Sequence, residues 1–379
     1  MTAGPVLVVE PYFGGSHRVW AEGIRDHLGL AVELVTLPPR WWKWRIRGGA
    51  VTLAEQLATL DFHPEAVIVS DMIDLPAFLT FSRRHLGDVP VGMYFHESQL
   101  TYPDSPQMEP DLSYAMTNWL SALAADTVWF NSRFHRDVFF EELPRLLRHF
   151  PDHTHEHLIP QVRERSEVLE PGIDLGWADA REDRRGRARI LWNHRWEHDK
   201  DPVAFFDAID VLAAEDHDFE VVVCGENFRV HAEEFTEAAR RHPGRIVHLG
   251  HAPVDRYRQL LLSADVVVST ARQEFFGIAI VEAMAAGAMP LVPNRLSYPE
   301  LVPMEWHDHC LYAPGALVDR LRRAVLEPDE TRRIGAAIAP SLRRFDWSAM
   351  APRYLAAVER LVERSPASRS PRRPGGGAD

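Results

Sequence analysis

The sequence lacks several features that would point to other classes of protein. Its 379 residues include two cysteines, Cys224 and Cys310, too few for a disulfide framework or a four-thiolate metal site. No apolar run approaches the roughly 20 residues that are needed to span a bilayer. The first residues, Met1 to Pro5, lack the charged and apolar regions of a signal peptide. We therefore expect a cytoplasmic protein with no membrane span.

Positive charge is also scarce. The formal net charge is −13, which argues against indiscriminate binding to nucleic acid, although a local basic patch can still bind it. Hydrophobic residues make up 46% and charged residues 26% of the chain, a balance typical of soluble globular proteins. A chain of this length has room for two domains, each with a full core.

Two similar sets of short apolar runs predict parallel strands. The first set is Pro5–Glu10, Val32–Leu37, Ala66–Asp71, Val91–His96 and Thr127–Ser132, and the second is Ile190–Arg195, Glu220–Gly225, Ile246–Gly250, Asp265–Thr270 and Met289–Asn294. Helical or mixed segments separate the runs, as in α/β folds with a parallel sheet. The G-x-G-x-x-G fingerprint of dinucleotide-binding folds is absent. Two such halves imply a cleft between them, a common place for a ligand.

The same pattern predicts the domain boundaries. Residues 1–178 form a predicted N-terminal Rossmann-like domain and residues 179–346 a predicted C-terminal one, with the charge-rich segment 179–189 as a hinge or linker. The helical segment 347–364 is expected to pack back on the first domain. The tail 365–379 consists mostly of Pro, Ser, Arg and Gly, and we expect it to be disordered.

The stretch from Glu274 to Gly287 carries the strongest functional signal. A buried strand is predicted before it, and the pattern after Phe276 predicts a helix that Gly277 opens and Gly287 ends. The free N–H groups of a helix start suit a phosphate, and Gly277 lets the backbone come close because it has no Cβ. Glu274 precedes this helix and Glu282 lies on its second turn. Two carboxylates beside a phosphate predict sugar hydroxyls on either side of a diphosphate. The alternative is a surface Glu and a half-buried helix Glu in an ordinary βα unit.

Basic residues follow the first predicted strand of the second half. Arg195 and Lys200 lie at its carboxyl end, the edge where open α/β sheets bind ligands. Together they could neutralise a departing nucleoside diphosphate, or they could belong to a solvated charged turn. Gly225 ends another strand of this half and is a candidate for the nucleotide pocket.

Polar residues also end the strands of the first half. Gly14 and Gly15 follow the first strand, and their backbone N–H groups could approach a donor phosphate, although a tight turn also needs glycine. His96 ends the fourth strand, where an imidazole could position the sugar or the acceptor. Glu97 and Gln99 follow it and could reach acceptor hydroxyls.

Two further stretches are unusual in composition. Between Arg40 and Arg47, three tryptophans alternate with four basic residues. Aromatic rings stack on bases and basic side chains meet phosphates, so this pattern suits RNA; equally, the tryptophans could pack inside with the arginines outside. Four histidines lie between His149 and His157. We predict that they form a solvated loop and not a metal site.

Several stretches across both halves resemble the tRNA-queuosine α-mannosyltransferase family, a group of GT-B glycosyltransferases of the family 4 type. The stretches are Val9–His17, Leu37–Pro38 with Trp42–Arg45, Tyr94–Pro103, Phe130–Ser132, Pro151–His153, His194–Pro202 and Glu274–Gly277. The strings Tyr-Phe-His-Glu and His-Arg-Trp-Glu-His-Asp-Lys are the most specific. The resemblance implies an α/β GT-B fold with two Rossmann-like domains whose parallel sheets face across a cleft. The first would hold the acceptor and the second the nucleotide-sugar donor.

The resemblance also implies a retaining transfer of mannose from GDP-mannose to queuosine in tRNA(Asp), and we hypothesise a course that requires no metal or other cofactor. Glu274 and His96 would be the catalytic residues. The implied donor-binding residues are Gly14, Gly15, Arg195, Lys200, Gly225, Phe276, Gly277, Ile278 and Glu282. The candidates for acceptor or tRNA contact are Ser16, His17, Trp42, Lys43, Trp44, Arg45, Glu97 and Gln99. A family 4 enzyme with a glycan, lipid or small-metabolite acceptor and a non-catalytic tRNA-binding protein with this fold stay open as alternatives.

Overall fold

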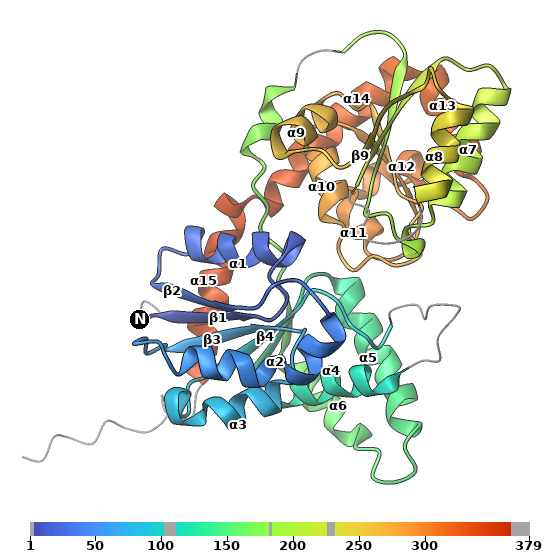
Figure 1. The fold of residues 1–379 in the computed structure, drawn as a ribbon. Coiled ribbons are helices and arrows are strands. Elements are labelled where there is room, and N and C mark those ends of the chain that lie inside the picture. Colours follow the sequence, from blue (N-terminus) through green and yellow to red (C-terminus); the bar gives the residue numbers. More distant parts are fainter. Residues whose placement is uncertain (1–3, 102–110, 182–183, 226–231, 365–379) are drawn as a thin grey trace, which may run out of the picture. The chain divides into compact units, whose positions relative to one another are not determined.

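The computed structural model describes residues 4–101, 111–181, 184–225 and 232–364. Two compact units make up the chain (Figure 1). Unit 1 comprises Met1–Gly172 with Trp347–Asp379, and unit 2 comprises Ile173–Asp346. The division falls after Gly172, earlier than the expected boundary at 178. The segment 179–189, expected to be a linker, therefore belongs to unit 2.

Unit 1 is built on a parallel sheet of six strands in the order β2-β1-β3-β4-β5-β6. The strands are β1 (Val6–Glu10), β2 (Val32–Thr36), β3 (Ala66–Ser70), β4 (Val91–Phe95), β5 (Thr127–Phe130) and β6 (Ser166–Val168). The five strands predicted for this half are all present. The edge strand β6 was not predicted, because its three half-buried residues form no apolar run.

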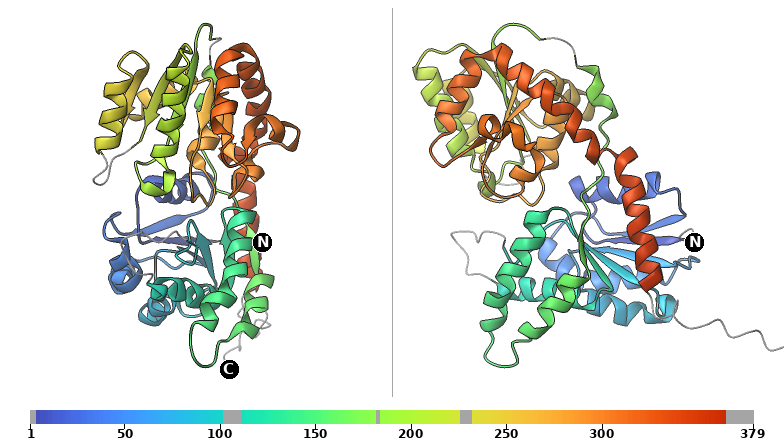
Figure 2. Two further views of the ribbon diagram at one scale, coloured as in Figure 1. Left: turned by 90° about the vertical axis from the view of Figure 1, so that its right-hand side faces the viewer. Right: turned by 180° about the vertical axis from the view of Figure 1, so that it is seen from behind.

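Helices cover both faces of this sheet. They are α1 (Gly15–His27), α2 (Trp42–Leu57), α3 (Leu75–Leu86), α4 (Leu112–Ala124), α5 (Arg133–Arg148), α6 (Ile159–Glu164) and α15 (Trp347–Arg364), with a 3₁₀ turn η1 (Glu156–Leu158). Val6 and Val8 point into the core that holds α1 and α15, whereas Leu7 and Val9 point into the core that holds α2 to α5. Figure 2 shows α15, in red, lying along one face of the sheet.

The C-terminal helix α15 is anchored to α1 by two tryptophans. Trp20 donates an indole hydrogen bond to the Tyr354 hydroxyl at 3.0 Å. The buried ring of Trp347 lies so close to Gly23 of α1 that a Cβ there would come within 2.2 Å of it. Gly172 also makes room for this ring, because a Cβ there would come within 2.3 Å of it. Helix α15 therefore belongs to the core of unit 1.

The substitution Gly23→Ala tests this contact. Alanine in a helix interior normally adds about 0.5–1 kcal/mol of stability relative to glycine. Here we expect a loss of about 1–3 kcal/mol, because the buried Trp347 ring cannot move away from the new methyl group. Gly48→Ala in α2 is the matched control, since its nearest neighbour is the exposed ring of Trp44, which can rotate. Urea unfolding of both variants measures the difference, and equal gains in stability would contradict the tight contact.

Unit 2 is built on a second parallel sheet of six strands, in the order β12-β11-β10-β7-β8-β9. The strands are β7 (Ala188–Asn193), β8 (Phe219–Cys224), β9 (Ile246–Gly250), β10 (Val266–Val268), β11 (Met289–Pro293) and β12 (Leu311–Tyr312). The five predicted strands are confirmed. The additional strand β12 was not predicted, because two residues are too few to form a period.

Two groups of helices enclose this sheet. Helices α9 (Val254–Leu262), α10 (Ile278–Ala285) and α14 (Pro328–Ile338) lie on one side of β9 in Figure 1, and α7 (Pro202–Ala214), α8 (Ala232–Arg241) and α13 (Leu317–Leu326) lie on the other. Short elements complete the unit: α11 (Tyr298–Leu301), α12 (His307–Cys310), η2 (Gly176–Ala180), η3 (His198–Lys200), η4 (Met304–Trp306) and η5 (Ala339–Phe345). Within the described residues of both units, no helix has the length and apolar character to cross a membrane.

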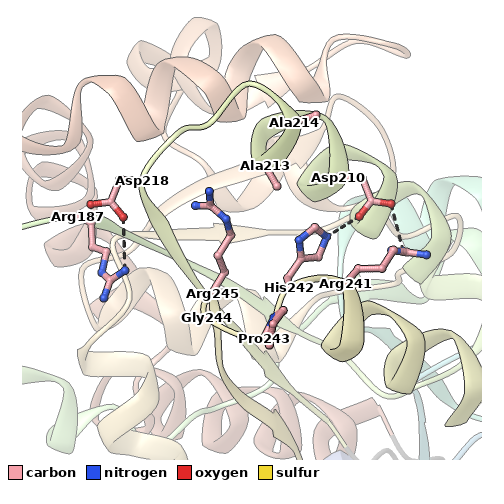
Figure 3. Close-up of a pocket in the computed structure, with 10 residues that line it drawn as sticks. All are labelled: Arg187, Asp210, Ala213, Ala214, Asp218, Arg241, His242, Pro243, Gly244 and Arg245. Atoms are coloured by element: carbon pink, nitrogen blue, oxygen red, sulfur yellow. Dashed lines mark hydrogen bonds and ion pairs between the residues drawn. The ribbon is translucent and has the colours of Figure 1, made fainter.

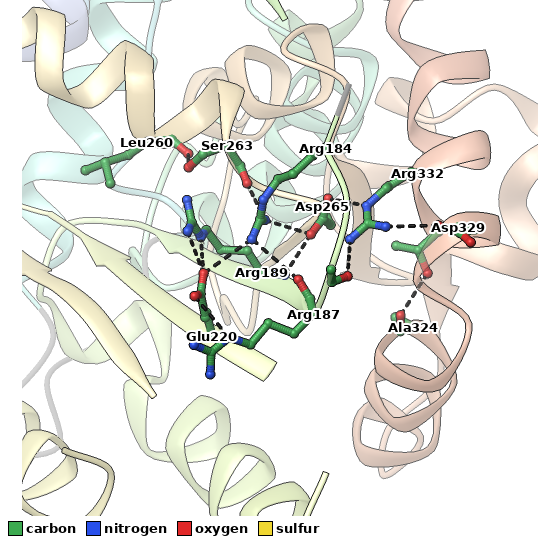
Figure 4. A network of polar contacts seen from close by, with 12 residues as sticks. Arg184, Arg187, Arg189, Glu220, Leu260, Ser263, Asp265, Ala324, Asp329 and Arg332 are labelled. Atoms are coloured by element: carbon green, nitrogen blue, oxygen red, sulfur yellow. Dashed lines mark hydrogen bonds and ion pairs between the residues drawn. The ribbon is translucent and has the colours of Figure 1, made fainter. Parts of the chain in front are cut away.

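A network of charges holds the amino-terminal edge of this second sheet (Figure 4). The fully buried carboxylate of Asp265 pairs with Arg184 at 2.8 Å and with Arg332 at 3.0 Å. Arg184 also reaches Glu220, which Arg189 contacts as well. Because each charge has a partner of opposite sign, we assign this network to structure. It fastens the segment around Arg184, part of the expected linker, to unit 2.

Candidate functional site

In unit 2, the carboxyl ends of β7 and β10 bring a lysine and a glutamate together. The ammonium of Lys200 donates to the carbonyl of Gln273 at 2.8 Å and to Glu274 Oε2 at 3.3 Å, and it pairs with Asp199 at 3.2 Å. Burial alone would lower the pKa of Lys200, but the charges of Glu274 and Asp199 outweigh it, so the pKa is raised. The sequence predicted Lys200 and Glu274 for one site, and the structure brings them into contact.

Helix α10 begins directly after this pair. Gly277 is its N-cap, and its φ of 101° lies in the left-handed region that favours glycine. A side chain there would be strained by this backbone conformation, although a Cβ would make only ordinary contacts with Glu274 and Tyr298. Phe276 is buried and Ile278 partly buried, so these two residues have mainly their backbone to offer a ligand. Ser297 stabilises this turn, because its hydroxyl donates to the Phe276 carbonyl at 2.8 Å.

Glu282 lies on α10 within a chain of polar side chains. The Tyr257 hydroxyl donates to Glu282 Oε2 at 2.6 Å and accepts from the Asn193 amide at 2.9 Å. Loss of hydration raises the pKa of Glu282, although the hydrogen bond from Tyr257 opposes this shift. The carboxylate is thereby oriented on the second turn of the helix. A fixed carboxylate of this kind suits a pair of ribose hydroxyls.

The remaining predicted residues of unit 2 flank this edge. Arg195 is exposed and pairs with Glu197 at 3.4 Å. Gly225 follows β8, and a Cβ there would lie 1.9 Å from the carbonyl oxygen of His194. The absence of a side chain at 225 therefore lets two strand-end loops pack together, which is a structural reason for glycine at this position.

In unit 1, the loop between β1 and α1 offers open backbone. Gly14 is the N-cap of α1 and lies against the ring of Pro39, where a Cβ would come within 2.4 Å of a ring carbon. Gly15 has a φ of 54°, and nothing lies within 4 Å of the place its Cβ would take. The start of α1 is thus accessible, with Gly15 and Ser16 exposed. Such a start can receive an anionic group.

Behind this loop, a buried carboxylate and two histidines converge. Glu10 ends β1 with no exposed surface, and its Oε2 lies 3.2 Å from His17 Nδ1 and 3.8 Å from His96 Nε2. Its other oxygen accepts from the Tyr12 N–H at 2.8 Å. The two imidazole centroids are 4.0 Å apart. His17 was predicted from the sequence to contact the acceptor, and in the structure its imidazole contacts Glu10.

The two histidines differ in charge. Burial would lower the pKa of His17, but the attraction and hydrogen bond of Glu10 raise it to about 9. The pKa of His96 falls well below its usual value, because His96 is buried and faces the charge of His17. At neutral pH the cluster thus holds one imidazolium ion paired with Glu10 beside one neutral imidazole. Neutral His96 can accept a hydrogen bond from a hydroxyl group.

Strand ends β3 and β5 hold the backbone of His96 in place. Its N–H donates to Asp71 Oδ1 at 2.7 Å, and its carbonyl accepts from the Asn131 amide at 2.8 Å. Burial raises the pKa of Asp71. Glu97 and Gln99 follow His96 and share a hydrogen bond of 3.0 Å. The sequence predicted His96, Glu97 and Gln99 for one place, and the structure places them along one short loop.

Three atoms of the cluster also have the composition of a metal site. Glu10, His17 and His96 offer ligand atoms within 4.8 Å of one another. Among the described residues this is the single such group of three. In the segment with four histidines between 149 and 157, His149 follows the end of α5, and η1 covers 156–158.

A polar hollow in unit 2 lies away from these residues (Figure 3). Its lining residues come from the last turns of α7, the end of α8 with the turn before β9, and the positions just before β7 and β8: Arg187, Asp210, Ala213, Ala214, Asp218, Arg241, His242, Pro243, Gly244 and Arg245. Asp210 contacts both Arg241 at 3.1 Å and His242 at 2.5 Å, and Arg187 pairs with Asp218 at 3.4 Å. The hollow lies at the edge opposite to the one where α/β sheets bind ligands. We do not assign it to the site.

Sequence reasoning missed the partners of the site. Glu10 carried a signal, because an acidic residue that ends an apolar strand needs a polar environment. Tyr257 carried none, since it lies on an amphipathic helix with no motif around it. Asp199 was part of a recognised motif, but its pairing with Lys200 depends on the turn of η3.

Comparisons with known proteins show what this chain is similar to. Residues 5–173 match the family described as tRNA-queuosine alpha-mannosyltransferase N-terminal, and residues 179–339 match Glycosyl transferases group 1. The chain is similar to the tRNA-queuosine alpha-mannosyltransferase of Drosophila melanogaster, with 34% identity over 311 residues, 79% of this chain and 82% of that protein. It is 26% identical over 199 residues to the GDP-mannose:cellobiosyl-diphosphopolyprenol alpha-mannosyltransferase of Xanthomonas oryzae, which covers 50% of this chain and 52% of that protein.

Solved structures share the fold. Anabaena HepE in complex with UDP and glucose matches with a TM-score of 0.68 at 15% identity, over 94% of this chain and 99% of that one. Sucrose-phosphate synthase from Thermosynechococcus elongatus matches with a TM-score of 0.70 at 15% identity, over 96% of this chain and 100% of that one. The predicted GT-B fold is therefore confirmed.

Proposed function

We propose that this chain, which belongs to the tRNA-queuosine α-mannosyltransferase family, transfers mannose from GDP-mannose to queuosine in tRNA. The observation that carries the proposal is the contact between Lys200 and Glu274 directly before the Gly277 helix start. A cation, a carboxylate and free N–H groups in this order suit a sugar diphosphate. The Xanthomonas relative, whose name includes GDP-mannose, supports guanine as the base of the donor. A tRNA acceptor would place the reaction in the cytoplasm.

Unit 2 binds the donor in this proposal. The start of α10 and the cations Arg195 and Lys200 stabilise the charge on the departing diphosphate. Glu274, held by Lys200, accepts hydrogen bonds from mannose hydroxyls. Glu282 accepts hydrogen bonds from the ribose. No second carboxylate serves as a nucleophile, in contrast to the usual glycosidases.

Unit 1 binds the acceptor. The neutral imidazole of His96 accepts a hydrogen bond from a sugar or acceptor hydroxyl that does not react, and the Glu10–His17 pair fixes the position of the ring. The bond between the anomeric carbon and the phosphate oxygen breaks as the bond to the acceptor oxygen forms on the same face. The acceptor proton passes to the departing phosphate oxygen. The α configuration is thereby retained, and the step requires no metal.

A donor and acceptor matrix tests the proposal. The purified protein is incubated with GDP-mannose, GDP-glucose, UDP-glucose or UDP-galactose, each with queuosine-containing tRNA, with the same tRNA lacking queuosine, or with no tRNA. Mass spectrometry of the nucleosides is expected to find one added hexose on queuosine when the donor is GDP-mannose, and none with the other three donors. Donor turnover without a tRNA product would favour a glycan, lipid or small-metabolite acceptor. Failure of every donor, with retained tRNA binding, would favour a non-catalytic protein.

The variant Glu274→Gln is the companion test. An amide can still donate to and accept from a hydroxyl group, but it removes the charge that Lys200 contacts. We therefore expect hexose transfer to fall by roughly tenfold to a hundredfold, with the KM for tRNA unchanged. Steady-state kinetics on both substrates measure the effect. Activity equal to that of the unaltered protein would remove Glu274 from the donor site.

A further inference from the structure

Two tryptophan rings lie in the open on unit 1, next to basic side chains. Trp41 is 69% exposed and Trp44 is 61% exposed. Trp42 is half-buried and packs on Tyr114 at 5.1 Å between ring centroids. Composition left two alternatives, three rings free for a partner or three rings packed inside. The structure lies between them, because one ring is covered and two are exposed. Two rings are available to a partner.

Two locally unfavourable features accompany the exposure of these rings. Trp41 has a φ of 50°, a left-handed conformation that is an outlier for a bulky residue. Trp44 lies over Gly48, where a Cβ would come within 2.6 Å of its ring, so a glycine inside α2 makes room for the ring to lie along the helix. Both features are unfavourable in themselves. They leave two flat aromatic surfaces at the start of α2.

The start of α2 is also electrostatically unsatisfied. Within the described residues, no side chain caps this helix, and its first turn holds no carboxylate but does hold Lys43. Positive charge at a helix N-terminus adds to the positive end of the helix dipole. Arg40 and Lys43 are exposed, and no described carboxylate lies within ion-pair distance of either. An anionic group would relieve this excess of positive charge.

Tyr114 orders the basic side chains on the inner side of the patch. The Lys43 ammonium lies 5.8 Å and the Arg47 guanidinium 4.9 Å from its ring centroid. Arg45, a candidate from sequence, donates to the Pro38 carbonyl at 3.1 Å and is occupied there. Arg47 donates to the Ser113 hydroxyl and lies 4.0 Å from the Asp111 carboxylate, so it is occupied as well. The exposed cations of the patch with no described ion-pair partner are therefore Arg40 and Lys43.

This patch adjoins the loop that leads to His17, whose ring lies 4.0 Å from that of His96. The Phe13 N–H donates to the Leu37 carbonyl at 2.9 Å, and Pro39 packs on Gly14. The loop before α2 and the loop before α1 are thus in direct contact within unit 1. A polymer bound at the patch can reach the start of α1.

We propose that the start of α2 is a binding surface for unpaired RNA, in which Trp41 and Trp44 stack on bases while Arg40 and Lys43 contact backbone phosphates. The proposal rests on the proposed function, because it names the surface that holds the tRNA substrate. Aromatic rings between cations are the combination that binds unpaired nucleotides. A membrane would require a second apolar face on this helix, but Ala50, Leu53 and Leu57 are buried in the core of unit 1.

Binding of two RNA probes tests the surface at one fixed salt concentration. One probe is an RNA hairpin with an unpaired loop, and the other is a fully paired RNA duplex of equal length. The variant Trp41→Asn with Trp44→Ala removes both rings, and asparagine tolerates the left-handed backbone at position 41. We expect its affinity for the hairpin to fall about tenfold for each ring, with little change for the duplex. Phe81→Ala, which removes a 56% exposed aromatic ring from α3, is the matched control and leaves both affinities unchanged.

A second variant separates charge from stacking. Arg40→Gln with Lys43→Gln is expected to weaken the hairpin and the duplex alike, because phosphate contacts do not depend on pairing. In steady state, the tryptophan variant raises the KM for queuosine-containing tRNA about tenfold or more and leaves kcat within about twofold. Circular dichroism confirms that each variant is folded.

Three outcomes would contradict the proposed RNA-binding surface or distinguish it from the proposed function. Unchanged hairpin affinity in the tryptophan variant would contradict the RNA-binding surface. Tryptophan-dependent sedimentation with vesicles of phosphatidylcholine and phosphatidylglycerol, without hairpin binding, identifies a membrane surface and also overturns it. The hairpin assay needs neither donor nor queuosine. Ring-dependent hairpin binding without transfer to tRNA would therefore support the surface while overturning the proposed function.

Discussion

Replacing Lys200 with methionine is expected to lower kcat by about a thousandfold, the upper end of what one lost electrostatic contact costs. Methionine fills a similar volume, so the change removes charge with little effect on packing. The loss has two causes. The departing diphosphate loses a cation, and Glu274 loses the partner that orients it. Steady-state kinetics with saturating tRNA measure kcat.

The variant Arg272→Met is the matched control. Arg272 lies on the same loop as Glu274 and carries the same charge, but its side chain is 58% exposed and pairs with Asp201 at 2.9 Å. We expect its kcat to stay within about twofold of that of the unaltered protein, because exposed ion pairs contribute little. A loss of less than tenfold in Lys200→Met would contradict the role of Lys200. Equal losses in both variants would indicate that net charge, and not position, matters.

The sequence predicted the fold through the strands, because a buried parallel strand needs a continuous apolar run that is visible in sequence. Ten such runs became ten strands. The edge strands β2 and β9, with five residues each, were predicted. The edge strands β6 and β12 escaped, because three half-buried residues and two residues are too few to show a pattern. The charge-rich segment 179–189 suggested a solvated linker. Arg184 in this segment pairs with Asp265, a partner that lies far along the chain.

The site was predictable only as far as strand ends and motifs define it. Lys200 and Glu274 follow strands β7 and β10, which are neighbours in the sheet, so their meeting follows from strand order. By contrast, which tryptophan of the stretch 41–44 is covered depends on Tyr114, a residue of α4. Composition could not distinguish Trp41 from Trp42. Contacts between elements distant in sequence decide exposure, and a single sequence does not record them.

The Glu10–His17 pair makes a second large prediction, which concerns stability and pH. Glu10→Gln is expected to lower the free energy of unfolding by about 3 kcal/mol at pH 6, an amount that corresponds to the rise in the pKa of His17 from 6.5 to about 9. Because the folded pKa of His17 is raised, the stabilisation is complete below pH 6.5 and is lost as the pH rises through about 9. The difference between the two proteins should therefore be largest at pH 6 and should shrink toward pH 10.

Urea unfolding of both proteins between pH 6 and pH 10 measures this difference. Asp71, Glu97 and His96 also face the pair, and burial raises the pKa of Asp71. The stability of each protein by itself therefore also changes with pH because these neighbouring groups titrate. Subtracting the variant from the unaltered protein isolates the contribution that depends on Glu10. Glu22→Gln on α1 is the matched control: its partner Arg18 is exposed, and we expect a change of less than about 1 kcal/mol at every pH. A difference that stays constant from pH 6 to pH 10 would mean that His17 is neutral throughout, and that Glu10 then positions His96 by shape and hydrogen bonding alone.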